Sequence, residues 1–267
     1  MEDSILIIDF HNDTYLKITQ TKKLFQSTSS LLQINYTNLI SSGVSGLFFS
    51  IWSNPTSDGE LAKIKTIAHM HELKKTFKLI PEEYLKFISI EGGFALNNDP
   101  NNISEFKQHG LKKLTLTHFS GPDWAGSEKE QSRGLNSLGA EIIMTLNEYG
   151  IIVDVAHASE KTMLDAIKVS KKPIVYSHGG VQKLNPISRC ISDLAIEGIC
   201  KNGGVIGISF FPDHLTSNLK HNRSEMEHFW KKYQKINSNH RLTDEKKLSF
   251  ETKLLLLNIH GLMKYQA

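Results

Sequence analysis

The chain has little cysteine, no long apolar run and little net charge. Each of these absences excludes a class of protein. Its 267 residues include only Cys190 and Cys200, too few for a disulfide framework and without the CxxC spacing of many zinc sites. Apolar runs stay well short of the roughly 18 residues that a membrane span needs. The net charge of +3 comes from dispersed lysines and short lysine pairs, which argues against nucleic-acid binding.

Other familiar signals are missing as well. The sequence has neither GxGxxG nor GxxxxGK[ST], the glycine-rich loops that bind nucleotide phosphates. Its first residues, MEDSILIID, have no basic n-region and no small-residue cleavage site, unlike a secretory signal. From the sequence we therefore expect a cytoplasmic protein that binds neither nucleic acid nor membrane.

What the chain does have is an alternation of short apolar runs and longer helical patterns. The expected strands are 5–9, 45–51, 87–90, 112–117, 150–155, 173–177 and 203–210. Several are apolar throughout, as in parallel sheets covered on both faces. The expected helices are 58–78, 136–148, 159–170 and 192–201, with Ser159 and Ser192 as N-caps and Gly150 as a C-cap. This alternation predicts βαβ units, either in a (βα)8 barrel or in an open doubly wound sheet.

Potential metal ligands follow five of the expected strands, and their distribution favours the barrel. In chain order, these residues are His11, Asp13, Glu91, His118, Asp154, His157 and His178. The carboxyl ends of barrel strands all open onto one face, where active sites lie. An open sheet instead gathers its ligands near one switch point. We therefore predict one α/β domain over residues 1–267, built as a (βα)8 TIM barrel.

The last fifth of the chain departs from this pattern. From about Pro212 to Ala267 the sequence is polar and helical in character, and it offers no convincing eighth strand. A seven-stranded barrel has two open edges, which natural folds avoid. We expect a barrel that lacks its last strand and helix, with a divergent helical part over residues 212–267.

Taken one at a time, the ligand candidates are ambiguous. His11 and Asp13 are two residues apart, so an extended segment points both to one side, but a polar turn is the commoner explanation. Glu91 precedes two glycines, in a place where burying a carboxylate is costly unless it is paired or metal-bound. His157 and His178 each follow a strand, where an ordinary hydrogen-bonded histidine is common.

Taken together, the candidates indicate a metal site. Imidazole and carboxylate ligands at one barrel mouth suit zinc, manganese or a similar divalent ion. Two imidazoles, a further His/Asp pair and a bridging Glu fit a binuclear centre with metals about 3.5–4 Å apart. We expect Asp9 and Asn12 to support the first ligand pair from behind.

Two further residues need not bind metal. His118 in LTLTHFSG also ends a strand, and it could polarise a carbonyl or stabilise developing negative charge. Arg189 follows His178 in the same loop, and its guanidinium fork matches a carboxylate. By itself, however, Arg189 is more simply explained as a surface charge.

In their order and intervals, these motifs resemble those of the membrane (renal-type) dipeptidases, peptidase family M19 of the amidohydrolase superfamily. The matches lie within roughly residues 5 to 212. They are DFHND at 9–13, IEGG at 90–93, LTH at 116–118, PDWAG at 122–126, GLNSLG at 134–139, VDVAH at 153–157, SH at 177–178, Arg189 and GGVIGISFF at 203–211.

The resemblance implies a metal-dependent hydrolase barrel with two zinc ions that hydrolyses small dipeptides through a metal-bridging hydroxide. The implied ligands are His11 and Asp13 for one zinc, His157 and His178 for the other, and Glu91 as a catalytic bridge. His118 is implied as a catalytic contact to the oxyanion, and Arg189 as an anchor for the substrate carboxylate. Many relatives dimerise, so a homodimer is a further expectation.

Two departures from the family pattern keep alternatives open. The family carries a late aspartate in a GSDFDG-like eighth strand, which serves as a proton shuttle, and the sequence shows no such motif. Cys190 follows Arg189 where Asn is common. Because general acid–base help is worth about 10²–10⁴-fold, one alternative is a catalytically impaired zinc-binding homologue. Another is an amidohydrolase acting on other small amides or lactones, since loops at the barrel mouth set specificity.

Overall fold

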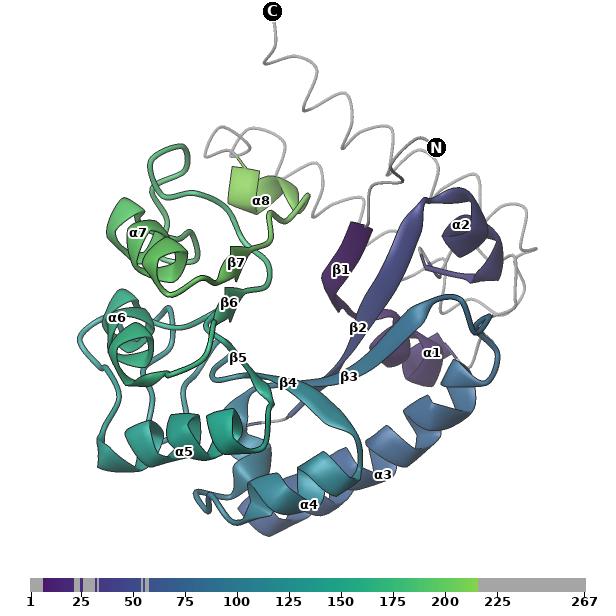
Figure 1. The fold of residues 1–267 in the computed structure, drawn as a ribbon, viewed down its shortest axis with the longest axis horizontal. Coiled ribbons are helices and arrows are strands. Elements are labelled where there is room, and N and C mark those ends of the chain that lie inside the picture. Colours follow the sequence, from purple (N-terminus) through teal and green to yellow (C-terminus); the bar gives the residue numbers. More distant parts are fainter. Residues whose placement is uncertain are drawn as a thin grey trace, which may run out of the picture.

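A parallel sheet that curls into part of a barrel organises the protein (Figure 1). The computed structural model describes residues 7–21, 25, 32, 34–53, 55 and 58–215. In chain order, the strands are β1 (Ile7–Asn12), β2 (Val44–Trp52), β3 (Leu85–Glu91), β4 (Leu111–Thr115), β5 (Ile152–Asp154), β6 (Val175–Tyr176) and β7 (Val205–Ile206). Each strand pairs in parallel with the next, which confirms the barrel-type α/β prediction. Within the described ranges, β1 and β7 are the edges of the sheet.

Helices cover the outer face of the curled sheet. They are α1 (Thr14–Thr21), α2 (Tyr36–Ser41), α3 (Gly59–Phe77), α4 (Asn102–Gln108), α5 (Ser137–Glu148), α6 (Glu160–Val169), α7 (Asp193–Lys201), α8 (Pro212–Leu215) and the 3-10 helix η1 (Gly93–Leu96). Helices α3 to α7 lie on the convex side (Figure 1). There they bury apolar side chains such as Met70, Phe106 and Ile142 against the strands. Each such side chain contributes about 1.5–3 kcal/mol on burial.

The four expected helices are confirmed, with ends within one residue of those predicted. Ser159 accepts a hydrogen bond from the Thr162 backbone amide, and Ser192 accepts one from the Ala195 amide, so both act as N-caps. The C-cap residue of α5 is Tyr149, and Gly150 follows it with a φ of 61°, the left-handed conformation that glycine adopts at low cost just past a helix end. The caps read from the sequence therefore set these helix ends.

The sequence does not predict the short helices α1, α2 and α4. They span 8, 6 and 7 residues, too few for a helical hydrophobic pattern to repeat clearly. Strand β1 also continues past residue 9 to Asn12, with register shifts against β2 between Asp9 and Asn12. His11 therefore lies inside the strand and Asp13 just beyond its end.

The expected C-terminal part falls mostly outside the described residues. Of the segment 212–267, only residues 212–215 are described, and they form α8. The expected strand 5–9 is described from Ile7 onward. The expectation of a barrel without its last strand, and that of one domain over residues 1–267, stay predictions.

Candidate metal centre

Glu91 occupies the middle of a cluster at the carboxyl ends of the strands. It is the last residue of β3 and only 4% exposed. Its Oε1 atom lies 3.6 Å from His11 Nε2, 3.3 Å from His157 Nε2 and 3.8 Å from His178 Nε2. One carboxylate oxygen thus faces imidazoles from three different strand ends.

The glycines after Glu91 explain how the strand turns there. Gly92 has a φ of 95°, a conformation that other residues rarely adopt. A side chain on Gly93 would overlap the ring of the buried Trp124. The IEGG motif therefore lets the backbone turn away directly behind the buried carboxylate.

His11 and Asp13 form the first pair, on the β1 side of the cluster. His11 Nε2 lies 3.6 Å from Asp13 Oδ1, and the Asp13 side chain is 57% exposed at the mouth. His11 Nδ1 meets the Ser50 hydroxyl at 2.9 Å, which leaves Nε2 facing Glu91. Asp9 accepts the His11 backbone amide and Asn12 donates to Phe48 O, so both hold the backbone of β1, whereas the group behind the His11 ring is Ser50.

His157 and His178 form the second pair, after β5 and β6. Their Nε2 atoms are 3.1 Å apart. His157 Nδ1 lies 3.0 Å from Glu128 Oε2, and His178 Nδ1 lies 2.8 Å from the Ser177 hydroxyl. His157 has a φ of 64°, an uncommon left-handed conformation for a residue other than glycine. Such strained backbone persists where surrounding contacts impose it, typically at functional sites.

Electrostatics favour the metal-binding forms of Glu91 and His178 but not that of His11, because Glu91 and Asp13 outweigh burial and raise the pKa of His11. Burial alone would raise the pKa of Glu91, but the His11 and His157 imidazoles outweigh burial and hold that pKa well below its usual range. Burial lowers the pKa of His178 well below its usual value, and nearby His11 adds to the effect. Metal ligands must be deprotonated to bind, and an ionised carboxylate beside a neutral imidazole meets that requirement.

The donor set fits divalent metal chemistry. Two groups have ligand atoms within 4.8 Å of one another: His11, Glu91 and His178, and Glu91, His118 and His157. The first group joins His178 with His11, whereas the resemblance assigns His178 to the ion held by His157. Because the two Nε2 atoms of His157 and His178 are only 3.1 Å apart, the donors form one continuous cluster. The assignment of each residue to an ion stays a prediction.

His118 packs beside His157, with ring centroids 4.6 Å apart, and faces the second oxygen of the Glu91 carboxylate. Its Nε2 is 4.0 Å from Glu91 Oε2, and its Nδ1 accepts a hydrogen bond from Trp52 Nε1 at 3.2 Å. Because the indole nitrogen only donates, His118 carries its hydrogen on Nε2, which faces the cluster. Burial lowers the pKa of His118, so the neutral imidazole presents an N–H there.

Arg189 is buried, and its interpretation as a surface charge is therefore wrong. It is only 6% exposed. Nη2 donates to His178 O at 2.7 Å, and Nη1 donates to Tyr176 Oη at 3.0 Å. Nε lies 3.3 Å from Glu128 Oε2, an ion pair without the alignment of a hydrogen bond. An arginine side chain carries five N–H groups. Three of them take part in these contacts, so two remain outside them.

The structure corrects the interpretation of Asp154 as a potential ligand. Asp154 is fully buried below the cluster and pairs with Lys113 Nζ at 2.5 Å. It also accepts from Thr115 Oγ1 and from the backbone amides of Ala156 and Ser177. Burial would raise its pKa, but Lys113 outweighs burial and lowers the pKa to about 2. This carboxylate is fully occupied by protein groups.

Sequence reasoning missed Lys113 and Glu128. Lys113 lies in the strand segment KKLTLT, at a position whose side chain points into the sheet's inner face. The alternation of side chains between the two faces of a strand was the only indication of its burial. Glu128 lies in a loop after β4, and its sequence neighbours show no pattern that predicts its burial beside His157.

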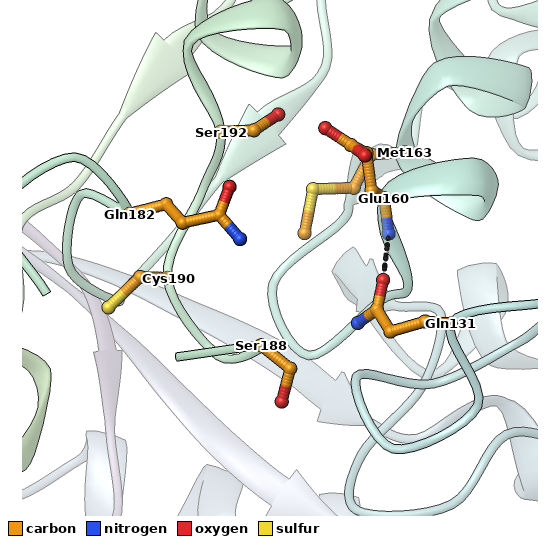
Figure 2. Close-up of a pocket in the computed structure, with 7 residues that line it drawn as sticks. All are labelled: Gln131, Glu160, Met163, Gln182, Ser188, Cys190 and Ser192. Carbon is orange, nitrogen blue, oxygen red and sulfur yellow. Dashed lines mark hydrogen bonds between the residues drawn. The ribbon is translucent and has the colours of Figure 1, made fainter. Parts of the chain in front are cut away.

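A separate pocket lies beside the loop that carries Arg189 (Figure 2). Its polar lining includes Gln131, Gln182 and Ser188, and Gln131 Oε1 accepts the Glu160 backbone amide at 3.1 Å. Among the described residues, the lining contains neither Glu91 nor any of the histidines around it, which are His11, His118, His157 and His178. The pocket is therefore distinct from the candidate metal centre.

A curled parallel sheet with imidazole and carboxylate donors at its carboxyl edge is typical of a metallohydrolase barrel. The model of one such family, "Membrane dipeptidase (Peptidase family M19)", matches residues 1–240. The chain belongs to this family.

Two curated relatives are dipeptidases by name. Dipeptidase tcpJ of Claviceps purpurea is 35% identical over 125 residues, which are 46% of this chain and 29% of the relative. The uncharacterized dipeptidase C965.12 of Schizosaccharomyces pombe is 29% identical over 133 residues, 48% of this chain and 32% of the relative. The matched region thus spans about a third or less of these relatives.

Solved structures support the fold. A Rhodobacter sphaeroides metallo peptidase liganded with a phosphinate mimic of L-Ala-D-Ala has a TM-score of 0.69 at 18% identity, covering 85% of this chain and 82% of that one. The probable dipeptidase PvdM of Pseudomonas aeruginosa has a TM-score of 0.73 at 18% identity, covering 97% and 76%. In the described part of this chain, every helix is too short or too polar to span a membrane.

Proposed function

We propose that the protein is a zinc-dependent dipeptidase that hydrolyses the peptide bond of small dipeptides at a binuclear centre. One observation carries the proposal: the buried Glu91 carboxylate faces three histidine Nε2 atoms within 3.3–3.8 Å at the carboxyl edge of the sheet. Family membership supports the reaction class. The dipeptide mimic bound by the Rhodobacter sphaeroides relative supports the substrate class.

In this proposal, His11 and Asp13 would hold one zinc, His157 and His178 would hold the other, and Glu91 would be the ligand that the two ions share. When bound, the ions would polarise the scissile carbonyl and lower the pKa of an attacking water. The chain's own residues then orient the substrate. The Nε2–H of His118 donates to the carbonyl oxygen as negative charge develops there. The two remaining N–H groups of Arg189 bind the substrate carboxylate.

The test is a dipeptide panel assayed on purified protein before chelation, after chelation and after zinc is added back. We expect hydrolysis that chelation abolishes and zinc restores. His71→Ala is the matched control, because His71 pairs with His109 on the exposed side of α3, away from the cluster. A folded, zinc-loaded protein that hydrolyses no dipeptide would contradict the proposal.

The same assay separates the alternatives. Two bound zinc ions without turnover indicate a catalytically impaired homologue. Turnover of lactones or other small amides in place of dipeptides indicates a different amidohydrolase activity. The expected homodimer and cytoplasmic location stay predictions.

A further inference from the structure

Only one half of the candidate metal centre has a histidine backed by a carboxylate, because His11 and His178 each meet a serine hydroxyl instead. Behind His11, the group that meets Nδ1 is the neutral hydroxyl of Ser50. Behind His157, it is the carboxylate of Glu128, whose side chain is only 7% exposed. A carboxylate behind a ligating imidazole raises its basicity and fixes its orientation more strongly than a hydroxyl does.

Glu128 holds His157 at two points. Its Oε2 lies 3.0 Å from His157 Nδ1, and its backbone amide donates to His157 O at 2.7 Å. Because an ionised carboxylate only accepts, the hydrogen of His157 lies on Nδ1, and the Nε2 lone pair faces Glu91 and His178. The backbone contact also holds His157 at its unusual φ of 64°.

Arg189 extends this support to the second histidine. Its Nε lies 3.3 Å from the same Glu128 oxygen, so the guanidinium neutralises the buried carboxylate. Its Nη2 donates to His178 O at 2.7 Å. The pair of Glu128 and Arg189 therefore contacts both histidines of one half of the centre, through the ring of one and the backbone of the other.

We propose that Glu128 and Arg189 are a positioning pair that makes the His157/His178 half the tighter of the two metal sites. The first zinc then enters this half, and the His11/Asp13 half fills second. Glu128 touches no reacting atom and acts through His157. This inference rests on the proposed binuclear centre and adds an order of filling to it.

Zinc titration of the metal-free, full-length protein tests the proposal. We expect two binding steps in the wild type. Glu128→Gln weakens the tighter step by about 10–100-fold and leaves the other unchanged, as is typical when a group behind a metal ligand is removed. Ser50→Ala does the reverse and weakens the second step. An unchanged tighter step in Glu128→Gln, or an equal loss in both steps, would overturn the proposal.

Glu130→Gln is the matched control in the same loop. Glu130 accepts the backbone amides of Gly121 and Ser127 and pairs with Arg133, so it shapes the loop without being bonded to either histidine. We expect Glu130→Gln to leave both zinc steps in place. If it weakens the tighter step as much as Glu128→Gln, loop order rather than the carboxylate explains the effect, and the proposal fails.

A second readout needs neither zinc nor turnover. Nitrogen chemical shifts of the histidine rings in the metal-free protein should show His157 with its hydrogen on Nδ1, and a mixture of tautomers in Glu128→Gln. If Glu128→Gln does not fold, Glu128→Asp retains a carboxylate and should keep the tautomer with a smaller loss of affinity. A wild-type His157 with its hydrogen on Nε2 would overturn the proposal, whereas absent dipeptide hydrolysis would overturn only the proposed function.

Discussion

Two clusters of buried charge lie close together on this sheet, and they are completed in different ways. In the lower one, the Asp154 carboxylate receives Lys113, Thr115 and two backbone amides, so its charge is satisfied by the protein. In the upper one, Glu91 faces three imidazole nitrogens at 3.3–3.8 Å, beyond ordinary hydrogen-bond distance for two of them. Glu91 therefore keeps acceptor capacity that these imidazoles do not use, whereas the protein groups around Asp154 fill its acceptor sites. The lower cluster is therefore structural, while the upper one is suited to a cation.

The largest expected effect comes from removing the centre of the upper cluster. Loss of a group behind a metal ligand typically costs about 10–100-fold in metal affinity or activity. Glu91→Gln removes a ligand itself, so it should lower zinc affinity and dipeptide hydrolysis by more than that. Zinc content and steady-state hydrolysis measure both effects. Glu148→Gln, an exposed glutamate at the end of α5, is the control and should change neither. Hydrolysis retained in Glu91→Gln would refute a central role for this carboxylate.

The lower cluster should dominate stability instead. Lys113→Ala leaves Asp154 buried without its cation, which should cost about 3–5 kcal/mol in the free energy of unfolding. Urea unfolding of the metal-free protein measures this change. Lys75→Ala, which breaks the exposed ion pair with Glu72, should cost at most about 1 kcal/mol. Equal losses in the two variants would mean that the Lys113–Asp154 pair is not structural.

Acid should weaken the lower cluster over a defined range of pH. The pKa of Asp154 falls from an ordinary value of 3.8 to about 2 in the folded protein. Because folding favours the ionised form of Asp154, this carboxylate stabilises the fold above pH 3.8. Its contribution of about 2 kcal/mol is lost as the pH falls from 3.8 through about 2. Urea unfolding of the metal-free protein across this range measures the loss. Asp154→Asn should unfold with a shallower pH dependence there, and an identical slope would contradict the assignment.

The smallest effect concerns the orientation of His118. Trp52→Phe removes the indole donor to His118 Nδ1, a hydrogen bond worth about 1 kcal/mol, or roughly fivefold in rate. The loss should fall on kcat and leave KM nearly unchanged, because the interaction at the carbonyl grows in the transition state. Steady-state kinetics separates the two constants. A rise in KM alone would indicate that His118 only binds the substrate.

The sequence predicts the parts of this molecule that depend on local pattern. The helix caps at Ser159 and Ser192 and the strand-end positions of His11, Glu91 and His178 follow from spacing alone, because parallel strands bring their carboxyl ends to one edge. The roles of Lys113 and Glu128 depend on neighbours that are distant in the chain, Asp154 for one and His157 for the other. No local pattern encodes such pairs, so only the folded arrangement reveals them.

Anomalous diffraction at the zinc edge, from crystals of the zinc-loaded protein, tests the central claim most directly. We expect two peaks, one on each side of the Glu91 carboxylate, with His11 and Asp13 at one and His157 and His178 at the other. The absence of a peak beside Glu91, with zinc bound only elsewhere on the protein, would contradict the claim.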